Sequence, residues 1–360
     1  MIEVKAPGKL YIAGEYAVVN PGHRALLISV DKFIHVRIKK SNNRGSIKSY
    51  SNIKMIWRRR GDKIVLEQKD DRFEYIFAAM SIVEKYIKEL KIPLQVYDIE
   101  VISDLESKDG IKYGLGSSAA VVVAIVKALL KFYNVMYSRL ELFKLAVLAN
   151  ISISTSGSCG DIAAAVYNGI IEYRSFSRNE IKNRLNKDQI INIINSKWEN
   201  LEIKEIPVNK EFKILVGWTK TPASSNLLVD NSRTNINNNL EFYNEFLLKS
   251  DKCVENLVRA YNETNFESLK GAIEENRLLL NEYAQKFNII IENENLKKLV
   301  EIAKNYNLAS KSSGAGGGDC GIAIANKSQN KDIVQKYWLE NDIQILDLNI
   351  YFGEKDEWNR

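Results

Sequence analysis

Hydrophobic and polar positions alternate loosely at the start of the chain, as they do in strands. The segments IEVKAP at 2–7, ALLISV at 25–30 and FIHVRIKK at 33–40 are rich in apolar residues at strand-like spacing. Pro21 and Gly22 stand between the first segment and the second, and this pair is typical of a turn. The first forty residues therefore predict strands joined by turns.

The middle of the chain changes to helical spacing. In FEYIFAAMSIVEKYIKEL at 73–90, apolar residues fall at positions 76, 77, 80, 83, 87 and 90, which predicts a helix with one apolar face. SSAAVVVAIVKALLKFY at 117–133 and LELFKLAVLANI at 140–151 are more evenly apolar and predict mostly buried helices. QVYDIEVIS at 95–103 predicts a strand, and DIAAAVYNGIIEY at 161–173 predicts a helix that leads into a strand.

After about residue 200 the pattern restarts. EFKILVGWT at 211–219 predicts a strand, residues 235–306 are mostly helical, and QILDLNIYF at 344–352 predicts a closing strand. A chain of 360 residues is long for a single core, so two domains are expected. The polar stretch KEIPVNKE at 204–211 is the best boundary and divides the chain into residues 1–205 and 206–360.

Composition and charge narrow the class of protein. Apolar residues make up 45% and charged residues 27%, which is ordinary for a soluble globular protein. The net charge of +6 fits either plain solubility or a preference for anionic ligands. The basic run RRRGDK at 58–63 lies between two strand-like runs and predicts a hairpin tip; without an aromatic platform it does not predict a nucleic-acid site.

The sequence predicts neither a membrane-spanning segment nor a secretory signal. The apolar run AAVVVAIV is followed too soon by Lys127 and Lys131 to span a bilayer, and no secretory signal stands at the start. The three cysteines show no CxxC pairing and there are two histidines, which argues against a structural zinc site. We expect a reduced, cytoplasmic protein, either a monomer or a homodimer.

The stretch YGLGSSAA at 113–120 is the most informative one. Its two glycines allow the backbone to turn tightly and approach a ligand, and Ser117 and Ser118 stand where an N-cap belongs. The helix N-terminus offers unpaired N–H groups and partial positive charge, which suit a di- or triphosphate, and a serine hydroxyl can reach Mg²⁺. The alternative is an ordinary capped helix. Lys112, just before the loop, either adds an ammonium group to the phosphates or is a solvated lysine.

Two further stretches carry one candidate residue each. Lys9 follows the Pro7–Gly8 turn in VKAPGKLYIAGEYAVV, and a lysine there can neutralise transferred phosphate or be one lysine among many. Asp161 in STSGSCGDIAAAVYNG follows a loop of small residues and starts a helix. It is either an N-cap or first-turn aspartate favoured by the helix dipole, or a carboxylate that orients an acceptor or holds metal.

The third loop, KSSGAGGGDCGIAIA at 311–325, has five glycines between Gly314 and Gly321 and one acid, Asp319, among them. Glycine-rich loops usually surround anions, so an acid is unexpected there. Three interpretations compete for Asp319. It shapes the turn while its side chain points away from phosphate, it holds a lysine or hydroxyl on the substrate side, or it binds metal; the first is favoured.

Taken together and in this order, these stretches resemble the GHMP kinase superfamily, over essentially the whole chain. APGKLYIAGEY at 6–16, GLGSSAA at 114–120 and SSGAGGGDCG at 312–321 match its three motifs. The resemblance implies an α+β fold with an N-terminal ATP-binding domain, a smaller C-terminal domain and an active site in the cleft between them. It also implies an ATP-dependent phosphotransferase.

Four details depart from the commonest pattern of the superfamily and are similar to its bacterial members that use 5-phosphomevalonate as acceptor. Tyr16 replaces a usual histidine, SGSCGD lacks proline before the aspartate, and Asp319 replaces a glycine. GWTKTPASS at 217–225 is similar to a substrate-side segment of those members. The alternatives are a kinase with an alcohol acceptor such as mevalonate, or an inactive nucleotide-binding sensor on the same fold.

The resemblance implies a role for each matched position. ATP would lie with its phosphates along Gly114, Leu115, Gly116, Ser117, Ser118 and Ala119, with Lys112 beside them and Mg²⁺ near Ser118. Lys9 and Asp161 would flank the reacting phosphates. The acceptor would face Glu15, Tyr16, Ser156, Gly157, Ser158, Lys220, Ser224, Ser313, Gly314, Ala315 and Gly316. Because a phosphate acceptor is already ionised at neutral pH, Asp161 is expected to position Lys9 or metal and to remove no essential proton.

Overall fold

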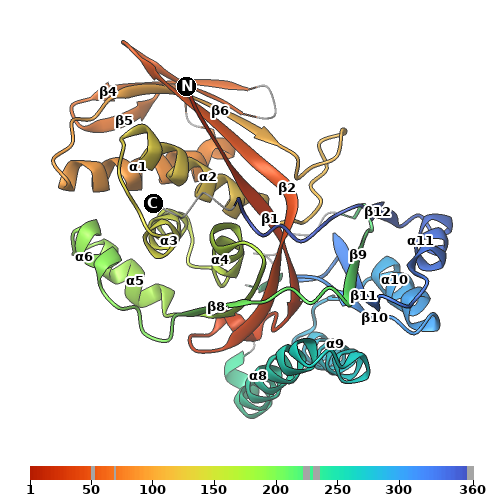
Figure 1. Ribbon diagram of the computed structural model, residues 1–360. Helices are drawn as coiled ribbons and strands as arrows, with labels where there is room; N and C mark the ends of the chain where they lie inside the picture. The colour runs from red at the N-terminus through yellow and green to blue at the C-terminus, as the bar shows by residue number, and fades with distance from the viewer. Residues whose placement is uncertain (50–52, 69, 222–227, 230–235, 355–360) are drawn as a thin grey trace.

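The computed structural model describes residues 1–49, 53–68, 70–221, 228–229 and 236–354. Two β-sheets organise this part of the chain (Figure 1). The first has eight strands in the order β5-β4-β3-β6-β2-β7-β8, with β1 paired to β2, and the second has four in the order β10-β11-β9-β12. The expectation of an α+β fold is confirmed.

The first sheet is built around a long hairpin formed by the first two strands. The predicted strands at 25–30 and 33–40 form a single strand, β2, because β1 pairs with it on both sides of Asp31 and Lys32. On its other edge, β2 pairs with β7 at residues 24–28 and with β6 at residues 34–41. The strands are β1 Ile2–Ala13, β2 Arg24–Ser41, β3 Gly45–Lys48, β4 Lys54–Arg60, β5 Lys63–Leu66, β6 Val96–Ser103, β7 Ile170–Arg174 and β8 Glu202–Ile206.

Helices cover this sheet, and the predicted apolar helices are indeed its core. Every residue of α2 from Ala119 to Leu130 is buried, and the helix packs on β1 and β2 between α1, α3 and α4. The even apolar composition of this helix follows from contacts on all sides. The helices of this half are η1 Ala17–Val19, η2 Asp71–Phe73, α1 Glu74–Glu89, α2 Ser117–Phe132, α3 Arg139–Ile153, α4 Gly160–Tyr167, α5 Arg178–Leu185 and α6 Ile190–Asn195.

In the second half, α9 and α10 pack against the smaller sheet, and α8 packs against α9 and the first sheet. The predicted closing strand is shorter than expected, since only Gln344–Leu346 pairs with β9. Ile350 then forms a single bridge with Val30, so the chain crosses back to the first sheet. The elements are β9 Phe212–Trp218, η3 Ile236–Asn239, α8 Leu240–Asn262, α9 Phe266–Phe287, α10 Glu294–Asn305, β10 Ala309–Ser312, β11 Cys320–Asn326, α11 Lys331–Glu340 and β12 Gln344–Leu346.

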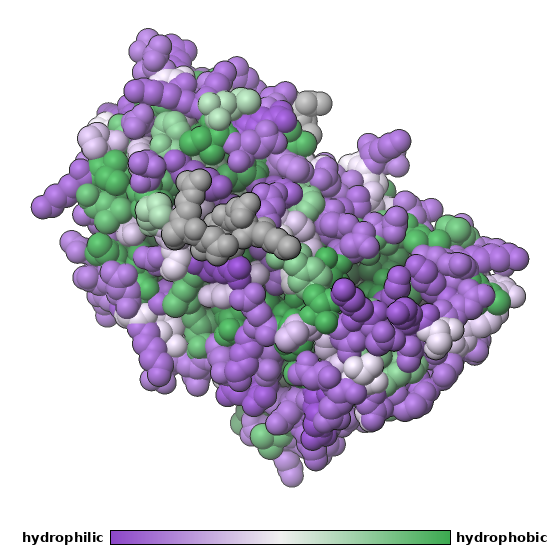
Figure 2. All heavy atoms as spheres, viewed as in Figure 1, coloured by the Kyte–Doolittle hydropathy of each residue, from purple (hydrophilic) through white to green (hydrophobic). Residues whose placement is uncertain are grey.

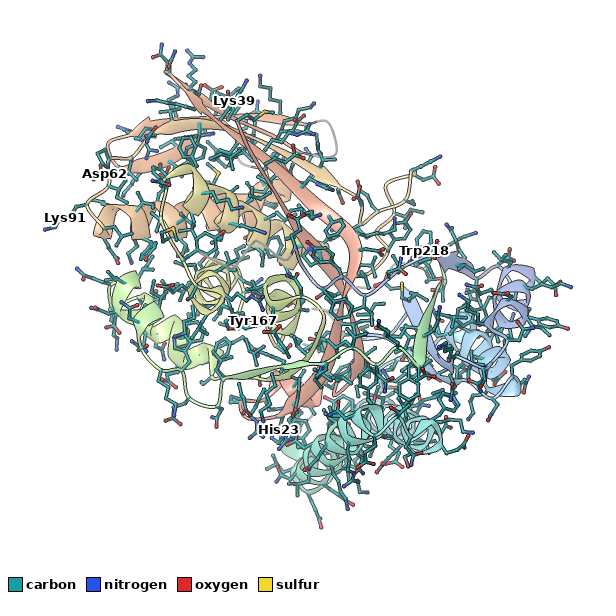
Figure 3. The ribbon with its side chains drawn as sticks, viewed as in Figure 1. His23, Lys39, Asp62, Lys91, Tyr167 and Trp218 are labelled. Atoms are coloured by element: carbon teal, nitrogen blue, oxygen red, sulfur yellow. The ribbon has the colours of Figure 1, made fainter. Side chains whose placement is uncertain are left out.

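The two halves are packed together around the turn that follows β1. Tyr16, Ala17 and Val19 belong to one apolar cluster with side chains of α8 and α9, and the ring of Tyr16 lies 4.8 Å from that of Tyr283. On the other side, Trp218 of β9 contacts Tyr113 edge-on at 4.9 Å (Trp218 is labelled in Figure 3). The loops before α2 and after β10 are thereby brought to one place.

The predicted hairpin at 58–63 is confirmed, with Arg60 opposite Lys63 across a turn at Gly61. Hydrophilic side chains cover most of the face shown in Figure 2. No helix in the described residues is long and apolar enough to cross a membrane.

Candidate active site

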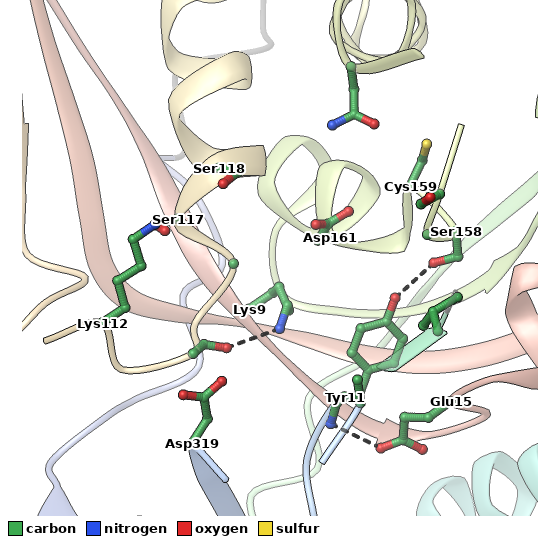
Figure 4. Close-up of a pocket in the computed structure, with 18 of the residues that line it drawn as sticks. Lys9, Tyr11, Glu15, Lys112, Ser117, Ser118, Ser158, Cys159, Asp161 and Asp319 are labelled. Atoms are coloured by element: carbon green, nitrogen blue, oxygen red, sulfur yellow. Dashed lines mark hydrogen bonds between the residues drawn. The ribbon is translucent and has the colours of Figure 1, made fainter. Parts of the chain in front are cut away.

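A cavity of about 650 Å³ lies where the two halves meet, which is within the size range of small-molecule sites (Figure 4). Its walls come from β1 and η1, the loop before α2, the start of α4 and the loops around β10 and β11. Fourteen of the predicted site residues line it: Lys9, Glu15, Tyr16, Lys112, Gly114, Gly116, Ser117, Ser118, Ser156, Gly157, Ser158, Asp161, Gly314 and Ala315.

One end of the cavity is formed by the loop that leads into α2. Gly114 and Gly116 have φ of 80° and 78°, a left-handed conformation that other residues rarely adopt. The expectation that a serine caps this helix is wrong, because Gly116 is the N-cap and Ser117 and Ser118 form the first turn. Both serines face the cavity with the helix N-terminus behind them, so their hydroxyls and N–H groups are available to an anion.

Two more of the predicted nucleotide-binding residues, Leu115 and Ala119, are buried. Leu115 is buried, and its carbonyl accepts a hydrogen bond from the N–H of Lys9 at 2.9 Å. Ala119 is buried in the body of α2. Neither residue lines the cavity, so a direct contact of either with nucleotide stays a prediction.

Lys9 extends from β1 toward the centre of the cavity. Its ammonium group donates to the carbonyl of Gly114 at 3.2 Å and lies 5.4 Å from the centre of the Tyr11 ring (Figure 4). A Cβ at Gly116 would lie only 3.0 Å from Cε of Lys9, so glycine at this position leaves the path of the lysine open. Lys9 is thus held between the α2 loop and the Tyr11 ring.

Asp161 faces Lys9 from the first turn of α4. Cys159, with φ of 62°, is the N-cap of this helix, and one Asp161 oxygen accepts the N–H of Ile162 at 3.0 Å. Removal from water raises the pKa of the Asp161 carboxyl, and the charge of Lys9 opposes that shift. A carboxyl with a raised pKa in a cavity beside a lysine is typical of a functional site.

Asp319 fits only part of the interpretation that the sequence favoured. Its backbone shapes the turn, with φ of 56° and an N–H that donates to the carbonyl of Thr221 at 2.7 Å. Its side chain, however, lines the cavity and lies against Gly114, where a Cβ would be 2.4 Å from Cβ of Asp319. The favoured expectation that this side chain points away from the phosphate site is therefore wrong.

The opposite wall consists of residues from the first and third motifs and from the loop before α4. The hydroxyl of Tyr16 donates to the carbonyl of Ala315 at 2.6 Å, and the N–H of Gly314 donates to Glu15 at 3.3 Å. The hydroxyls of Tyr11 and Ser158 are 2.9 Å apart. These contacts join the loop after β10, the end of β1 and the loop before α4 into one wall.

Three predicted acceptor residues do not line the cavity, and a fourth is not among the described residues. Ser313 exchanges two hydrogen bonds with the backbone of Tyr11, at 2.9 and 3.0 Å, and holds the third loop to β1. Gly316 packs against the backbone of Ile291, and Lys220 is exposed with φ of 57°. Ser224 lies outside the described residues. Contacts of these four with an acceptor stay predictions.

Sequence reasoning missed several side chains of the wall. Tyr11, Asn150, Ser154 and Cys159 line the cavity, and Lys311 lies directly behind it. Tyr11 is part of the first motif, so its place on the same strand face as Lys9 was a usable signal. Burial raises the pKa of the Cys159 thiol to about 12, which leaves it unreactive at neutral pH.

The chain belongs to the GHMP kinases, a family of ATP-dependent kinases. Family models of the GHMP kinases N terminal domain and of the GHMP kinases C terminal domain match residues 74–169 and 255–343. The family expected from the three motifs is confirmed.

Relatives within the family are similar over nearly the whole chain. The phosphomevalonate kinase of Streptomyces sp. (strain CL190) is 31% identical over 347 residues, which cover 92% of each chain. A structure of the Streptococcus pneumoniae phosphomevalonate kinase in complex with phosphomevalonate and AMPPNP has a TM-score of 0.86 and 30% identity, covering 97% of this chain and 100% of that one. The mevalonate kinase of Methanocaldococcus jannaschii is 24% identical over 346 residues, or 95% of this chain and 97% of its own.

Proposed function

We propose that this kinase transfers the γ-phosphoryl group of ATP to the phosphate of (R)-5-phosphomevalonate, giving ADP and 5-diphosphomevalonate in the mevalonate route to isoprenoids. The observation that supports this most strongly is the full-length similarity to a relative whose structure holds phosphomevalonate together with an ATP analogue. The higher identity to phosphomevalonate kinase than to mevalonate kinase favours the phosphorylated acceptor.

The nucleotide phosphates would bind at the α2 end of the cavity. Gly114 and Gly116 allow close approach of the backbone, Ser117 and Ser118 present the helix N-terminus, and Lys112 supplies an ammonium group. The acceptor would bind at the other end, against Tyr16, the loop 154–158 and the turn at Gly314–Ala315. Lys9 and Asp161 would then lie between the two ligands.

The chemical step brings two polyanions together, so charge neutralisation is its main requirement. Lys9 donates to the Gly114 carbonyl, beside the place where the transferred group would pass, and its charge would stabilise that group. The acceptor oxygen is already ionised at neutral pH, which removes the need for a strong base. Asp161 would orient Lys9 and balance its charge.

Mg²⁺ fits the residues present. In the described part of the chain, no group of three or more His, Cys, Asp or Glu side chains could hold a metal ion by itself. A cavity that offers the Ser118 hydroxyl and the Asp161 carboxylate suits an ion bound mostly by nucleotide phosphates and water. When bound, Mg²⁺ would supply positive charge to the phosphates.

Three further features belong to the proposal. The chain would divide into an ATP-binding part, residues 1–205, and a second part, residues 206–360. The last strand of the first sheet ends at Ile206 and the first strand of the second begins at Phe212, which supports this division. The protein would act as a monomer or homodimer in the cytoplasm.

A coupled assay of ADP release tests the proposed function. Purified protein is supplied with ATP, Mg²⁺ and either 5-phosphomevalonate or mevalonate. We expect turnover with the phosphorylated acid and little with mevalonate. Turnover with mevalonate alone would instead assign an alcohol kinase, and binding of ATP without turnover of any acceptor would assign a nucleotide sensor.

A further inference from the structure

The charges on the cavity wall are poorly matched to an anionic acceptor. In the described part of the chain, the lining side chains include three carboxylates, Glu15, Asp161 and Asp319, and two ammonium groups, Lys9 and Lys112. Lys311 neutralises Glu15 from behind. Lys112 lies at the α2 end and Lys9 at the centre, so no lining cation of the described residues serves the acceptor end.

A buried cation lies behind that end. Arg178 is 6% exposed and is the first residue of α5. Its Nε donates to the carbonyl of Thr155 at 2.7 Å and its Nη2 to that of Val19 at 3.3 Å. Val19 and the neighbours of Thr155, Ser154 and Ser156, line the cavity. One guanidinium group therefore ties together two segments of the acceptor wall.

The positive charge of Arg178 is not balanced by an ion pair among the described residues. The third nitrogen, Nη1, is buried without a hydrogen-bond partner, and no carboxylate of the described residues forms an ion pair with Arg178. Burying a cation without a counter-ion raises the free energy of the folded state. Its position at a helix N-terminus, where the helix dipole is positive, raises that free energy further. An anion bound nearby would offset both.

The charge of Arg178 also reaches the cavity. Burial raises the pKa values of Asp161 and Cys159, which both line it, and Arg178 is among the positive charges that oppose these shifts. The electrostatic interaction of Arg178 with these groups passes through the low-dielectric interior, where charges are screened less than in water. An anionic group at the acceptor end would feel the same field.

We infer that Arg178 is a positioning residue that makes the cavity selective for a phosphorylated acceptor. It holds the carbonyls of Thr155 and Val19, and through them the acceptor wall, and its positive charge favours an acceptor phosphate over an uncharged alcohol end. This inference rests on the proposed function, because it concerns the acceptor of the same reaction.

The test compares Arg178→Gln and Arg178→Lys with wild type and with Arg184→Gln. Arg184 is a matched control on the same helix, where it bonds Ser196 and Asp188. Calorimetry gives the Kd of each full-length protein for 5-phosphomevalonate and for mevalonate, without ATP. Steady-state assays give kcat and the KM for each substrate, and thermal melting reports on the fold.

We expect Arg178→Gln to raise the Kd and KM for 5-phosphomevalonate at least about tenfold, since a buried charge is lost. The KM for ATP should stay within about twofold of wild type, and the Kd for mevalonate should change far less than that for the phosphorylated acid. Arg178→Lys keeps the charge and should lose less affinity for 5-phosphomevalonate. Arg184→Gln should have the Kd and KM values of wild type.

An equal loss of affinity for both acids in a folded Arg178→Gln protein would overturn the inference, because it would show only a role in holding the wall. If that variant does not fold, Arg178→Lys decides, because lysine keeps the positive charge. A preserved preference for the phosphorylated acid then supports the inference, and a lost preference overturns it. Wild-type turnover reports on the proposed function separately.

Discussion

Lys311 and Glu15 form an ion pair inside the protein, with 2.5 Å between Nζ and Oε1 and at most 3% of either side chain exposed. The pair joins β10 to the turn after β1, two segments that are 296 residues apart in the chain. Lys311 also donates to the carbonyl of Ser312 at 2.6 Å, and Glu15 accepts the N–H of Gly314. It therefore fixes the third motif against the first and holds the cavity wall opposite α2.

Breaking this pair should destabilise the fold strongly. We expect Lys311→Met and Glu15→Gln each to lower the free energy of unfolding by about 3–5 kcal/mol, because each leaves a buried group uncompensated. Denaturation in urea measures the loss. The double variant should lose less than the sum of the two, since the buried charge then disappears with its partner.

Lys327→Met is the control, because Lys327 pairs with Glu211 at the surface, at 3.7 Å. Its cost should be less than about 1 kcal/mol. A similarly small loss in Lys311→Met would contradict the structural role of the buried pair.

Lys9→Met should leave the fold intact and lower kcat by about a thousandfold or more, because the charge that faces the transferred phosphoryl group is lost. Steady-state assays with ATP and 5-phosphomevalonate measure the change, and a thermal melt checks the fold. Lys39→Met, at the far end of β2 (Figure 3), is the matched control and should retain wild-type kcat. If Lys9→Met lowered kcat less than tenfold, a central role of Lys9 in catalysis would be contradicted.

Asp161→Asn should lower activity and raise stability at neutral pH. Burial raises the pKa of Asp161 above its ordinary value of 3.8, with the charge of Lys9 opposing the shift. A carboxyl of this kind stabilises the fold below pH 3.8, and that contribution is lost as the pH rises through the folded-state pKa. The asparagine variant should therefore melt at a higher temperature than wild type at pH 7.5, and this gain should vanish near pH 3.

The same variant should lose at least about tenfold in kcat at pH 7.5, because Lys9 is no longer oriented by a charge. Nearly full turnover would rule out a catalytic part for the Asp161 carboxylate. A lower melting temperature at pH 7.5 would contradict the cost assigned to its burial.

Gly114→Ala should impair ATP binding, because the added Cβ would meet the Asp319 side chain at 2.4 Å and φ of 80° strains an alanine. We expect the KM for ATP to rise at least about tenfold. Combining it with Asp319→Gly removes the clash and should restore part of the affinity, whereas no recovery would show that Asp319 does not contact the loop. Asp319→Gly alone should lower kcat less than Lys9→Met does.

The part of the site that was predictable from the sequence lies within short motifs. Lys9, Ser118 and Asp161 come from three separate stretches, and the structure brings them to one cavity. The glycines at 114 and 116 were expected to turn the backbone tightly, and both have the left-handed conformation. The residue types of a motif and the turn conformation of its glycines depend on neighbours in the chain. They can therefore be predicted from the sequence.

The rest depends on contacts between distant segments. Nothing in its own segment distinguishes Lys311 from other lysines, and its importance comes from Glu15 at the other end of the chain. Arg178 likewise reads as an ordinary first-turn residue until the fold places Thr155 and Val19 against it. The position of Ser117 was misjudged because a left-handed Gly116 takes the N-cap.

The acceptor itself is the most direct test of the account. The measurement is kcat/KM for ADP release by the wild-type protein with ATP and Mg²⁺, for 5-phosphomevalonate and for mevalonate in parallel. We predict that 5-phosphomevalonate is preferred by at least about a hundredfold, because the positive charges of Lys9 and Arg178 would favour a phosphate over an uncharged alcohol. Equal values, or a preference for mevalonate, would contradict the assignment of a phosphate acceptor.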